Sequence, residues 1–486
     1  MGLALFMVAL LAILFYIFLN QKTLLHVISI SSATLFMLIA FFLTRSVLRD
    51  GVIYSAGFFY LDALSAMILD IVLIIGWIAS IYSVGYLETE VKTGKLEVSQ
   101  IKLYYLLMAA FNFSMMLALT ARSMGIMWIG IEATTLTSVF LVGFYNAKKD
   151  LEAAWKYVII CSVGISLALL GIIFLHLSSV EVLNGSHLLS WPDLFANAAD
   201  LRSSILKLAF IFTLVGFGTK AGLAPMHTWL PDAHSQAPSP VSALLSGVLL
   251  NTAMYGIIRT AAIVNKNLGS SSYTGHLLIA IGVLTMLISA ISMLTQKDYK
   301  RMLAYSSIEH MGIITVAIGI FSPAAIWGAF FHMVNHSLTK SMLFFASGDI
   351  YLHYHSKKIA NVKGLLQALP LVGTVFFLGL FAIAGVPPFS IFASEFSIIA
   401  AVFDGGHLFL GAFLVLLLAV VFVAIALVLF KMFFGKEGST EPSVAGNVSG
   451  EVMLVVMLVM ISVGGLYLPD QLIQLISQAQ KLIIGG

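Results

Sequence analysis

Several ionisable side chains lie inside apolar stretches of this 486-residue sequence. Glu132 follows the run Met127-Trp-Ile-Gly-Ile, and Lys220 follows Gly216-Phe-Gly-Thr. If such a stretch crosses a bilayer, one charge near its centre costs about 2.5–3.5 kcal/mol even on the most lenient scale. A charge retained at that cost usually has a partner of opposite sign or conducts protons or cations. We therefore interpret Glu132 and Lys220 as candidate ion-translocating residues.

Two histidines and a lysine recur every four residues, at His332, His336 and Lys340. On an α-helix this spacing places all three on one face, with a rise of about 6 Å between neighbours. Histidine changes charge near neutral pH, so the pattern favours a proton wire. Two alternatives remain open: the histidines can be structural, or they can share a zinc ion as i and i+4 ligands. The sequence offers no convergent third ligand and no HExxH glutamate, so we predict no metal site.

Three further residues belong to the candidate set for ion translocation. Lys156 opens an apolar run, so its ammonium group can equally well extend to the membrane surface. His310 directly follows Glu309, and structural pairing of these two is an equal alternative to a role in translocation. Glu395 follows a proline-containing interruption of another apolar run.

The elements that position these residues are predicted to be membrane-spanning helices. Of all residues, 60% are hydrophobic and only 10% are charged, whereas a soluble domain carries about 25% charged residues. Runs long enough to cross about 30 Å of hydrocarbon predict an all-α polytopic membrane protein of about fourteen helices. The runs lie near 2–19, 24–44, 63–86, 103–120, 124–144, 155–177, 203–223, 241–264, 276–295, 300–321, 323–348, 370–403, 407–431 and 451–468.

Two of the predicted spans are discontinuous. Proline and glycine interrupt the seventh within Gly216–Pro225 and the twelfth at Gly385–Pro388. Such breaks free backbone groups that need protein or water partners, so they line cavities. Broken spans at matching positions predict two inverted five-helix repeats within a single membrane domain. The predicted divisions are 1–102 for three spans and a loop, 103–264 and 276–431 for the repeats, and 451–486 for the last span and a C-terminal tail.

Charge and cysteine content exclude several classes of function. A formal net charge of +3 provides no basic surface for nucleic acid. The single cysteine, Cys161, excludes an iron–sulfur cluster held by this chain alone. Loops after odd-numbered spans carry about twice as many Lys and Arg residues as loops after even-numbered spans. This bias predicts a cell (inner or plasma) membrane protein with the odd loops in the cytoplasm and both termini outside.

Longer motifs indicate a family. Lys220 is followed by the run Pro225-Met-His-Thr-Trp-Leu-Pro-Asp-Ala-His-Ser-Gln-Ala-Pro, within Gly216–Arg259. Together with Lys297–Gly312 and the His332–Lys340 segment, it resembles the antiporter-like membrane subunits of respiratory complex I, of Mrp cation/proton antiporters and of energy-converting membrane-bound hydrogenases. The likeness covers nearly the whole chain.

This resemblance implies roles for the candidate residues. In the family, a glutamate in span five pairs with a lysine in span seven, matching Glu132 and Lys220. A central line of lysines and histidines follows, matching the span-eleven triplet His332–Lys340, and it ends at Glu395 in span twelve. Many members carry a lysine in span eight where this sequence has Asn251. Because an asparagine can orient water but cannot carry a proton, we expect water or the span-eleven histidines to conduct protons there.

Residues 246–251 and 307–310 look most like the F-type membrane component of hydrogenase-4 and formate hydrogenlyase complexes. This likeness implies a proton- or sodium-translocating subunit of a redox-driven complex, a group 4 membrane-bound hydrogenase or close kin, without a catalytic redox centre or cofactor of its own. The implied partners are other membrane subunits, lipids and a peripheral redox arm that holds iron–sulfur clusters and an active-site metal. The alternatives are a subunit of an Mrp-type cation/proton antiporter, which Asn251 and Glu395 argue against, and a scaffold subunit that does not pump.

Overall fold

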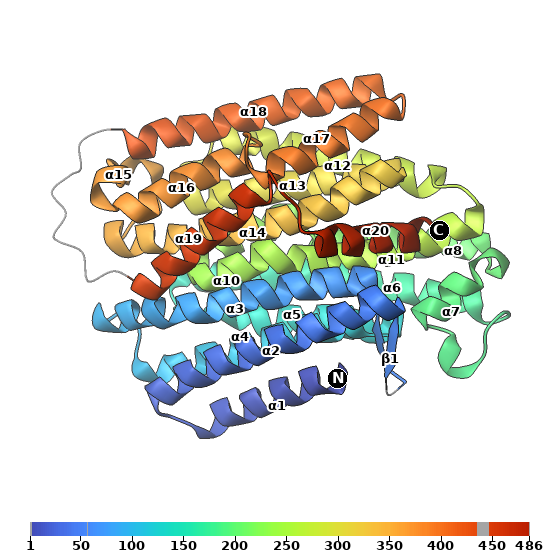
Figure 1. Cartoon of the computed structure of the whole chain (residues 1–486), viewed down its shortest axis with the longest axis horizontal. Helices are drawn as coiled ribbons and strands as arrows, with labels where there is room; N and C mark the ends of the chain where they lie inside the picture. The colour runs from blue at the N-terminus through green and yellow to red at the C-terminus, as the bar shows by residue number, and fades with distance from the viewer. Residues whose placement is uncertain (1, 56, 435–446, 486) are drawn as a thin grey trace.

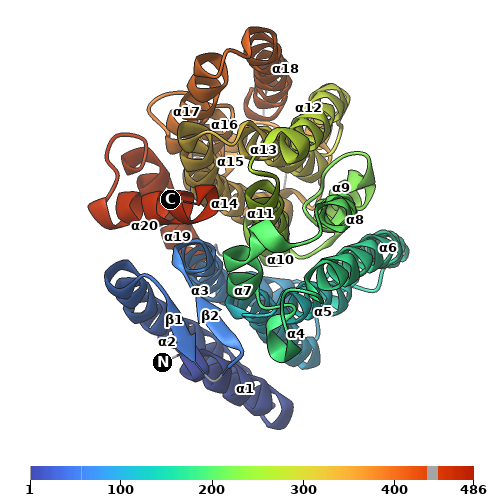
Figure 2. The same ribbon diagram turned by 90° about the vertical axis from the view of Figure 1, so that its right-hand side faces the viewer.

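The computed structural model of the chain describes residues 2–55, 57–434 and 447–485. Its long helices run side by side along the horizontal direction of Figure 1, and Figure 2 looks along the bundle. Large apolar side chains are exposed on the outer helices, for example Phe409, Phe140 and Phe18. In a membrane these side chains face lipid, which explains how a chain with 60% hydrophobic residues leaves so many of them outside its core.

The N-terminal part contains three long helices and one short β-hairpin. The helices are α1 (Gly2–Phe18), α2 (Lys22–Asp50) and α3 (Ala63–Lys92). Strands β1 (Ile53–Ser55) and β2 (Phe59–Leu61) lie between α2 and α3 and pair antiparallel, with Ile53 opposite Leu61. This hairpin adds a small β element to the helical fold that the sequence predicts, because strands this short leave no periodic pattern.

The next part of the chain contains the broken seventh span. Its helices are α4 (Val98–Thr120), α5 (Met124–Val142), α6 (Lys148–Ser179), α7 (Trp191–Ala196), α8 (Ser203–Lys220), α9 (Trp229–Gln236), α10 (Ser239–Leu244) and α11 (Leu250–Leu268). A π-helical turn, Leu245–Leu249, joins α10 to α11. Helix α8 ends at Lys220, and Gly222 follows with φ +78°, a conformation that suits glycine. The predicted break is therefore confirmed.

The following part contains the second broken span. Its helices are α12 (Ser272–Leu294), α13 (Tyr299–Ile320), α14 (Pro323–Tyr354), α15 (Leu365–Ala368), α16 (Pro370–Ile383), α17 (Ser390–Asp404) and α18 (Leu408–Phe433). The predicted break in span twelve lies between the end of α16 and the start of α17. Helices α19 (Val448–Val463) and α20 (Asp470–Ile484) complete the described chain. The structure forms α20 where the sequence predicts only a tail, and α20 packs against α3 and α14.

Each predicted span coincides with a helix or with a pair of half-helices. Among the described residues, ten helices are long and apolar enough to cross a membrane, and three shorter apolar helices are α1, α16 and α19. The multi-pass membrane fold predicted from the sequence is therefore confirmed.

The centre of the bundle lies around α10, α11, α13 and α14, as the view along the helices shows (Figure 2). The most apolar part of the continuous segment Ser239–Leu268 is completely buried inside the protein. Helix α14 packs against α3, α10, α13 and α17. Polar side chains on these central helices are shielded from lipid, so they need protein or water partners.

Candidate functional site

Lys220, the last residue of α8, lies in a cluster of hydroxyl groups. It is 1% exposed, and its Nζ donates hydrogen bonds to Tyr157 OH at 2.5 Å and to Thr135 Oγ1 at 2.8 Å. The Thr135 hydroxyl in turn donates to Glu132 Oε2 at 3.3 Å. None of the described ion pairs includes Lys220. The structure thus links Glu132 to Lys220 through the Thr135 hydroxyl instead of through direct contact of the two charges.

The break after α8 positions the Lys220 ammonium group. A cation at the carboxyl end of a helix interacts favourably with the helix dipole. Trp229, the first residue of α9, covers the site: its indole donates to the Thr219 carbonyl oxygen at 2.9 Å. The Trp229 ring also lies 4.7 Å from the Tyr157 ring, centroid to centroid. The broken span therefore holds α6, α8 and α9 together around one lysine.

Lys156 lies outside this cluster, near the beginning of α6. Its side chain is 48% exposed and forms ion pairs with Glu152 at 2.6 Å and with Asp232 at 3.3 Å. Asp232 also contacts Arg301. The structure places Lys156 in a surface ion-pair network, which is compatible with the membrane-surface position that the sequence left open.

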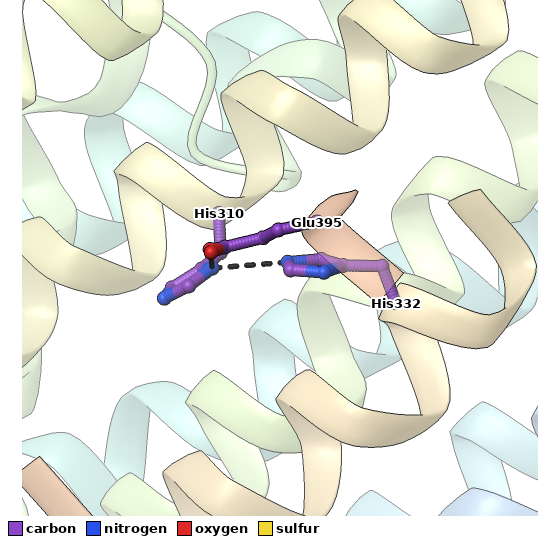
Figure 3. A group of neighbouring side chains, drawn as sticks. All are labelled: His310, His332 and Glu395. Carbon is purple, nitrogen blue, oxygen red and sulfur yellow. Dashed lines mark hydrogen bonds and ion pairs between the residues drawn. The ribbon is translucent and has the colours of Figure 1, made fainter. Parts of the chain in front are cut away.

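A second cluster forms where α13, α14 and α17 meet (Figure 3). His310 Nδ1 lies 3.0 Å from His332 Nε2 and 3.7 Å from Glu395 Oε1. The centroids of the two imidazole rings are 5.1 Å apart. Both histidines are completely buried, and Glu395 is 6% exposed. A proton can therefore pass from ring to ring and to a carboxylate inside the protein.

Additional polar groups lie behind the two rings. His310 Nε2 lies 3.6 Å from Glu309 Oε2, and His332 Nδ1 lies 2.9 Å from Ser394 Oγ. The Ser394 hydroxyl donates to a backbone carbonyl, that of Ile391 at 2.9 Å, so its oxygen is left to accept from the His332 ring. The hydrogen of a neutral His332 is then on Nδ1, and its lone pair is on Nε2, facing His310.

The span-eleven triplet does not form a ladder by itself. His332, His336 and Lys340 are all buried on α14, but no described hydrogen bond connects them to one another. His310 of α13 lies between the two histidines, with its ring centroid 5.4 Å from that of His336. Lys340 donates to Ser306 Oγ on α13 at 2.7 Å. The neighbouring helix therefore supplies groups that lie against the triplet, and no described hydrogen bond joins Lys340 to either histidine.

Asn251 lies on α11 beside this triplet. Its Nδ2 donates to Ser337 Oγ at 2.8 Å and to the Gly247 carbonyl oxygen at 3.2 Å. Its Oδ1 is buried and has no hydrogen-bond partner among the residues that the structure describes. No described hydrogen bond joins the Lys220 cluster to the histidine cluster, so a proton route between them needs water.

A polar cavity of about 310 Å³ opens near the loop that follows α14. It is lined by Tyr86, Lys95, Asp150, Gln236, Lys300 and Lys357, among others. Lys357, in that loop, donates to Gln236 Oε1 at 3.0 Å. Burial lowers the pKa of Lys357, and Asp298 and Asp150 partly offset this effect. Since Gln236 is the last residue of α9, the cavity reaches the polar segment that follows Lys220.

Sequence reasoning missed the hydroxyl groups that contact the ionisable residues. Thr135 lies three residues after Glu132 on α5, so helical spacing alone could have identified it. Tyr157 and Ser306 come from other helices, and only the packing of those helices brings them to Lys220 and Lys340.

Among the described residues, His310, His332 and Glu395 also form a possible metal site. One ligand atom from each residue lies within 4.8 Å of the other two. The zinc alternative considered from the sequence instead pairs His332 with His336. His336 is not part of the group, and neither of its ring nitrogens has a hydrogen-bond partner among the described residues.

Two family models match the chain. The model described as NADH:quinone oxidoreductase/Mrp antiporter, TM, matches residues 121–424. The model described as NADH-ubiquinone oxidoreductase (complex I), chain 5 N-terminus, matches residues 53–95. The chain is also 37% identical over 429 residues to the Hydrogenase-4 component F homolog of Methylacidiphilum infernorum, which covers 88% of this chain and 89% of that relative.

Two solved structures have the same fold. A chain of the membrane-bound sulfane sulfur reductase, an archaeal respiratory membrane complex, matches with a TM-score of 0.88 and 23% identity over 99% of this chain and 97% of that one. A chain of the Mrp complex from Dietzia sp. DQ12-45-1b matches with a TM-score of 0.84 and 19% identity, also over 99% and 97%.

Proposed function

Because the chain belongs to the NADH:quinone oxidoreductase/Mrp antiporter family of membrane proteins, we propose that it translocates protons as one subunit of a redox-driven complex of the membrane-bound hydrogenase type. The relative that covers 88% of the chain is named as a hydrogenase-4 component. This relationship favours a hydrogenase-type complex over a redox-free antiporter.

The observation that carries the proposal is the hydroxyl-linked arrangement of Glu132 and Lys220. Through Thr135 the two charges are at most about 6 Å apart, where they interact by about 3 kcal/mol at an effective dielectric constant of about 20. Moving or neutralising Glu132 therefore changes the affinity of Lys220 for its proton by about 100-fold. A change of this size is sufficient to switch the lysine between holding and releasing a proton.

The histidine cluster continues the route toward α17. Lys340, His336, His310 and His332 carry the proton through the centre of the bundle, and Glu395 receives it at the second helix break. Lysine and histidine are positively charged when protonated and repel Na⁺, so their predominance here favours protons over sodium ions. Asn251 orients water in the interval where relatives carry a lysine.

The redox chemistry belongs to partner subunits in this proposal. The single cysteine, Cys161, is buried in α6, so this chain offers no thiolate set for an iron–sulfur cluster. Other membrane subunits and lipids surround the bundle, and a peripheral arm with iron–sulfur clusters and an active-site metal drives it. The lysine-rich cavity near Lys357 faces the cytoplasm and admits protons.

Purification of the tagged chain from native membranes in mild detergent tests the assembly. We expect other antiporter-like membrane subunits to copurify together with iron–sulfur subunits. Copurification of membrane subunits alone, from membranes in which the redox subunits are expressed, would contradict the hydrogenase-type assignment and support an Mrp-type antiporter.

A further inference from the structure

Three potential metal ligands point to one position in the core, each from a different helix (Figure 3). His310 Nδ1 is 3.0 Å from His332 Nε2 and 3.7 Å from Glu395 Oε1, and all ligand atoms of the group lie within 4.8 Å of one another. Ligands that surround a tetrahedral zinc ion at about 2.05 Å are about 3.3 Å apart. The His310–His332 and His310–Glu395 separations bracket this value. Rotation of the flexible Glu395 side chain can adjust the remaining separation, between Glu395 and His332.

The group behind one of the two histidines matches that of known metal sites. A histidine ligand usually donates its second ring N–H to a carboxylate, a carbonyl or water, which fixes the ring and strengthens the ligand. Ser394 Oγ occupies this place for His332 at 2.9 Å, whereas Glu309 Oε2 lies 3.6 Å from His310 Nε2, beyond hydrogen-bond distance. The Ser394 contact leaves the lone pair of His332 on Nε2, directed at the shared position.

Carboxylate oxygens in and beside this cluster lack hydrogen-bond partners. Glu395 Oε1 and both carboxylate oxygens of Glu309 are buried and accept no hydrogen bond from the residues that the structure describes. Leaving a buried carboxylate without a partner is unfavourable. Lys340 interacts electrostatically with Glu309 but donates its hydrogen bonds to Ser306 and to the Leu303 carbonyl. A divalent cation beside Glu395 would supply the partner that its carboxyl oxygen lacks.

We propose that His310, His332 and Glu395 bind one divalent transition-metal ion, for which Zn²⁺ is the best match. Two imidazole nitrogens and one carboxylate are the ligand set of zinc sites that keep a fourth position open. Mg²⁺ and Ca²⁺ prefer oxygen ligands throughout. When the metal binds, the hydrogen of His310 is on Nε2, where it faces Glu309, and Nδ1 coordinates the ion.

Metal binding has a consequence for transport, which rests on the proposed function. The ion occupies the lone pairs of His310 Nδ1 and His332 Nε2, between which the proton passes when the site is empty. Bound Zn²⁺ therefore stops proton translocation through the cluster without changing the redox subunits.

Metal binding to the intact purified complex tests the site. After equilibration with Zn²⁺ and removal of the free ion, we expect one zinc more per complex in the wild type than in His310→Gln or His332→Gln. Added Co²⁺ should give the intense visible absorption of a tetrahedral site in the wild type only. Ser394→Ala, which removes the support of His332 and an acceptor for Asn335 but no metal ligand, should weaken zinc binding by about 10–100-fold.

The surface pair His187 and Asp193, 2.9 Å apart, provides the control. His187→Gln should leave the Co²⁺ spectrum and the tightly bound zinc unchanged. Equal zinc content in the wild type and both ligand variants, or a Co²⁺ spectrum unaffected by all three site variants, would overturn the proposal. If a histidine variant does not assemble, the zinc affinity of Ser394→Ala decides the question alone.

The same samples separate the metal site from the proposed function. Loss of zinc in the ligand variants supports the site whatever the transport rate. If zinc binds at the site and proton translocation continues at the wild-type rate, the site is confirmed and the proton route through His310 and His332 is contradicted.

Discussion

Lys220 is held by two neutral hydroxyl groups, and this arrangement determines how it responds to Glu132. A carboxylate in direct contact would hold the ammonium group charged. The hydroxyls of Thr135 and Tyr157 accept hydrogen bonds from the ammonium group, but they add no negative charge. The lysine therefore depends on the more distant Glu132 for electrostatic support. Thr135 is the side chain that transmits this dependence, because it contacts both residues.

Thr135→Val should uncouple the pair while preserving the shape of the site. A hydrogen bond to a charged group contributes about 1.5–3 kcal/mol, so we expect proton translocation to slow by about tenfold or more. Thr134→Val is the matched control, since Thr134 is equally buried on α5 but donates only to the Ile131 carbonyl. The measurement is proton translocation by the assembled complex in proteoliposomes. Equal rates for the two variants would exclude Thr135 as the link.

At the residue scale, the sequence predicts isolated charges better than their partners. Glu132 and Lys220 could be identified because a charge in an apolar run is costly wherever the helix packs. Ser394 and Tyr157 could not, since hydroxyl residues are common in such helices and gain significance only from packing. Lys156 illustrates the opposite case: its position at the start of a span fits both interpretations, and only helix packing brings it to Asp232.

At the scale of elements, glycines set the spacing of the helices that carry the histidines. A Cβ atom at Gly282 of α12 would lie 2.8 Å from the Gly312 carbonyl oxygen of α13, and one at Gly275 would lie 2.5 Å from the Gly319 carbonyl oxygen. These contacts leave no room for a side chain. Because His310 lies half a turn before Gly312, the approach of α12 fixes where the His310 ring meets α14.

Gly282→Leu should therefore disturb the histidine cluster from a distance. Overpacking a tight contact costs typically about 1–3 kcal/mol, so we expect a lower thermal unfolding midpoint and slower proton translocation. Ala280→Leu adds a comparable side chain on the exposed face of the same helix and should change neither. Thermal unfolding of the purified complex, followed by tryptophan fluorescence, compares the two. A midpoint lowered equally in both variants would contradict the role of the glycine contact.

The elements themselves were largely predictable, and the contacts between them were not. Proline and glycine in apolar runs predict both helix breaks, and the four-residue spacing of His332, His336 and Lys340 correctly predicts three buried residues on α14. The insertion of His310 between the two histidines depends on how α13 packs, which no local pattern records. The same reason explains why α20 was predicted as a tail: its apolar face becomes recognisable as a core surface only against α3 and α14.

For the molecule as a whole, the lysine bias predicts one polarity of the bundle in the membrane. Helix α1 begins and α20 ends toward the right-hand side of Figure 1, and α7 lies at that end, whereas α15 lies at the opposite end. The loop before α15 contains Lys357 and Lys363 and lies near the lysine-lined cavity. The predicted topology places this left-hand end in the cytoplasm.

Cysteine labelling of intact cells tests this orientation. In a Cys161→Ser background, Asp200→Cys after α7 should react with a membrane-impermeant maleimide, because it faces the outside. Lys363→Cys before α15 should react only after the cells are permeabilised. Both positions are exposed, so accessibility within the protein does not distinguish them. Labelling of position 363 but not of position 200 in intact cells would reverse the topology.

The central claim is that the buried Lys220 carries the translocated proton. Lys220→Gln retains donors for Thr135 and Tyr157 but cannot bind or release a proton. Lys207→Gln, on the exposed part of the same helix, is its control. The most direct measurement is the number of protons translocated per electron by the assembled complex in proteoliposomes. We predict the wild-type ratio for Lys207→Gln. For Lys220→Gln we predict a ratio lowered by the share of this subunit, because the other antiporter-like subunits can still pump. A wild-type ratio in an assembled Lys220→Gln complex would contradict the account.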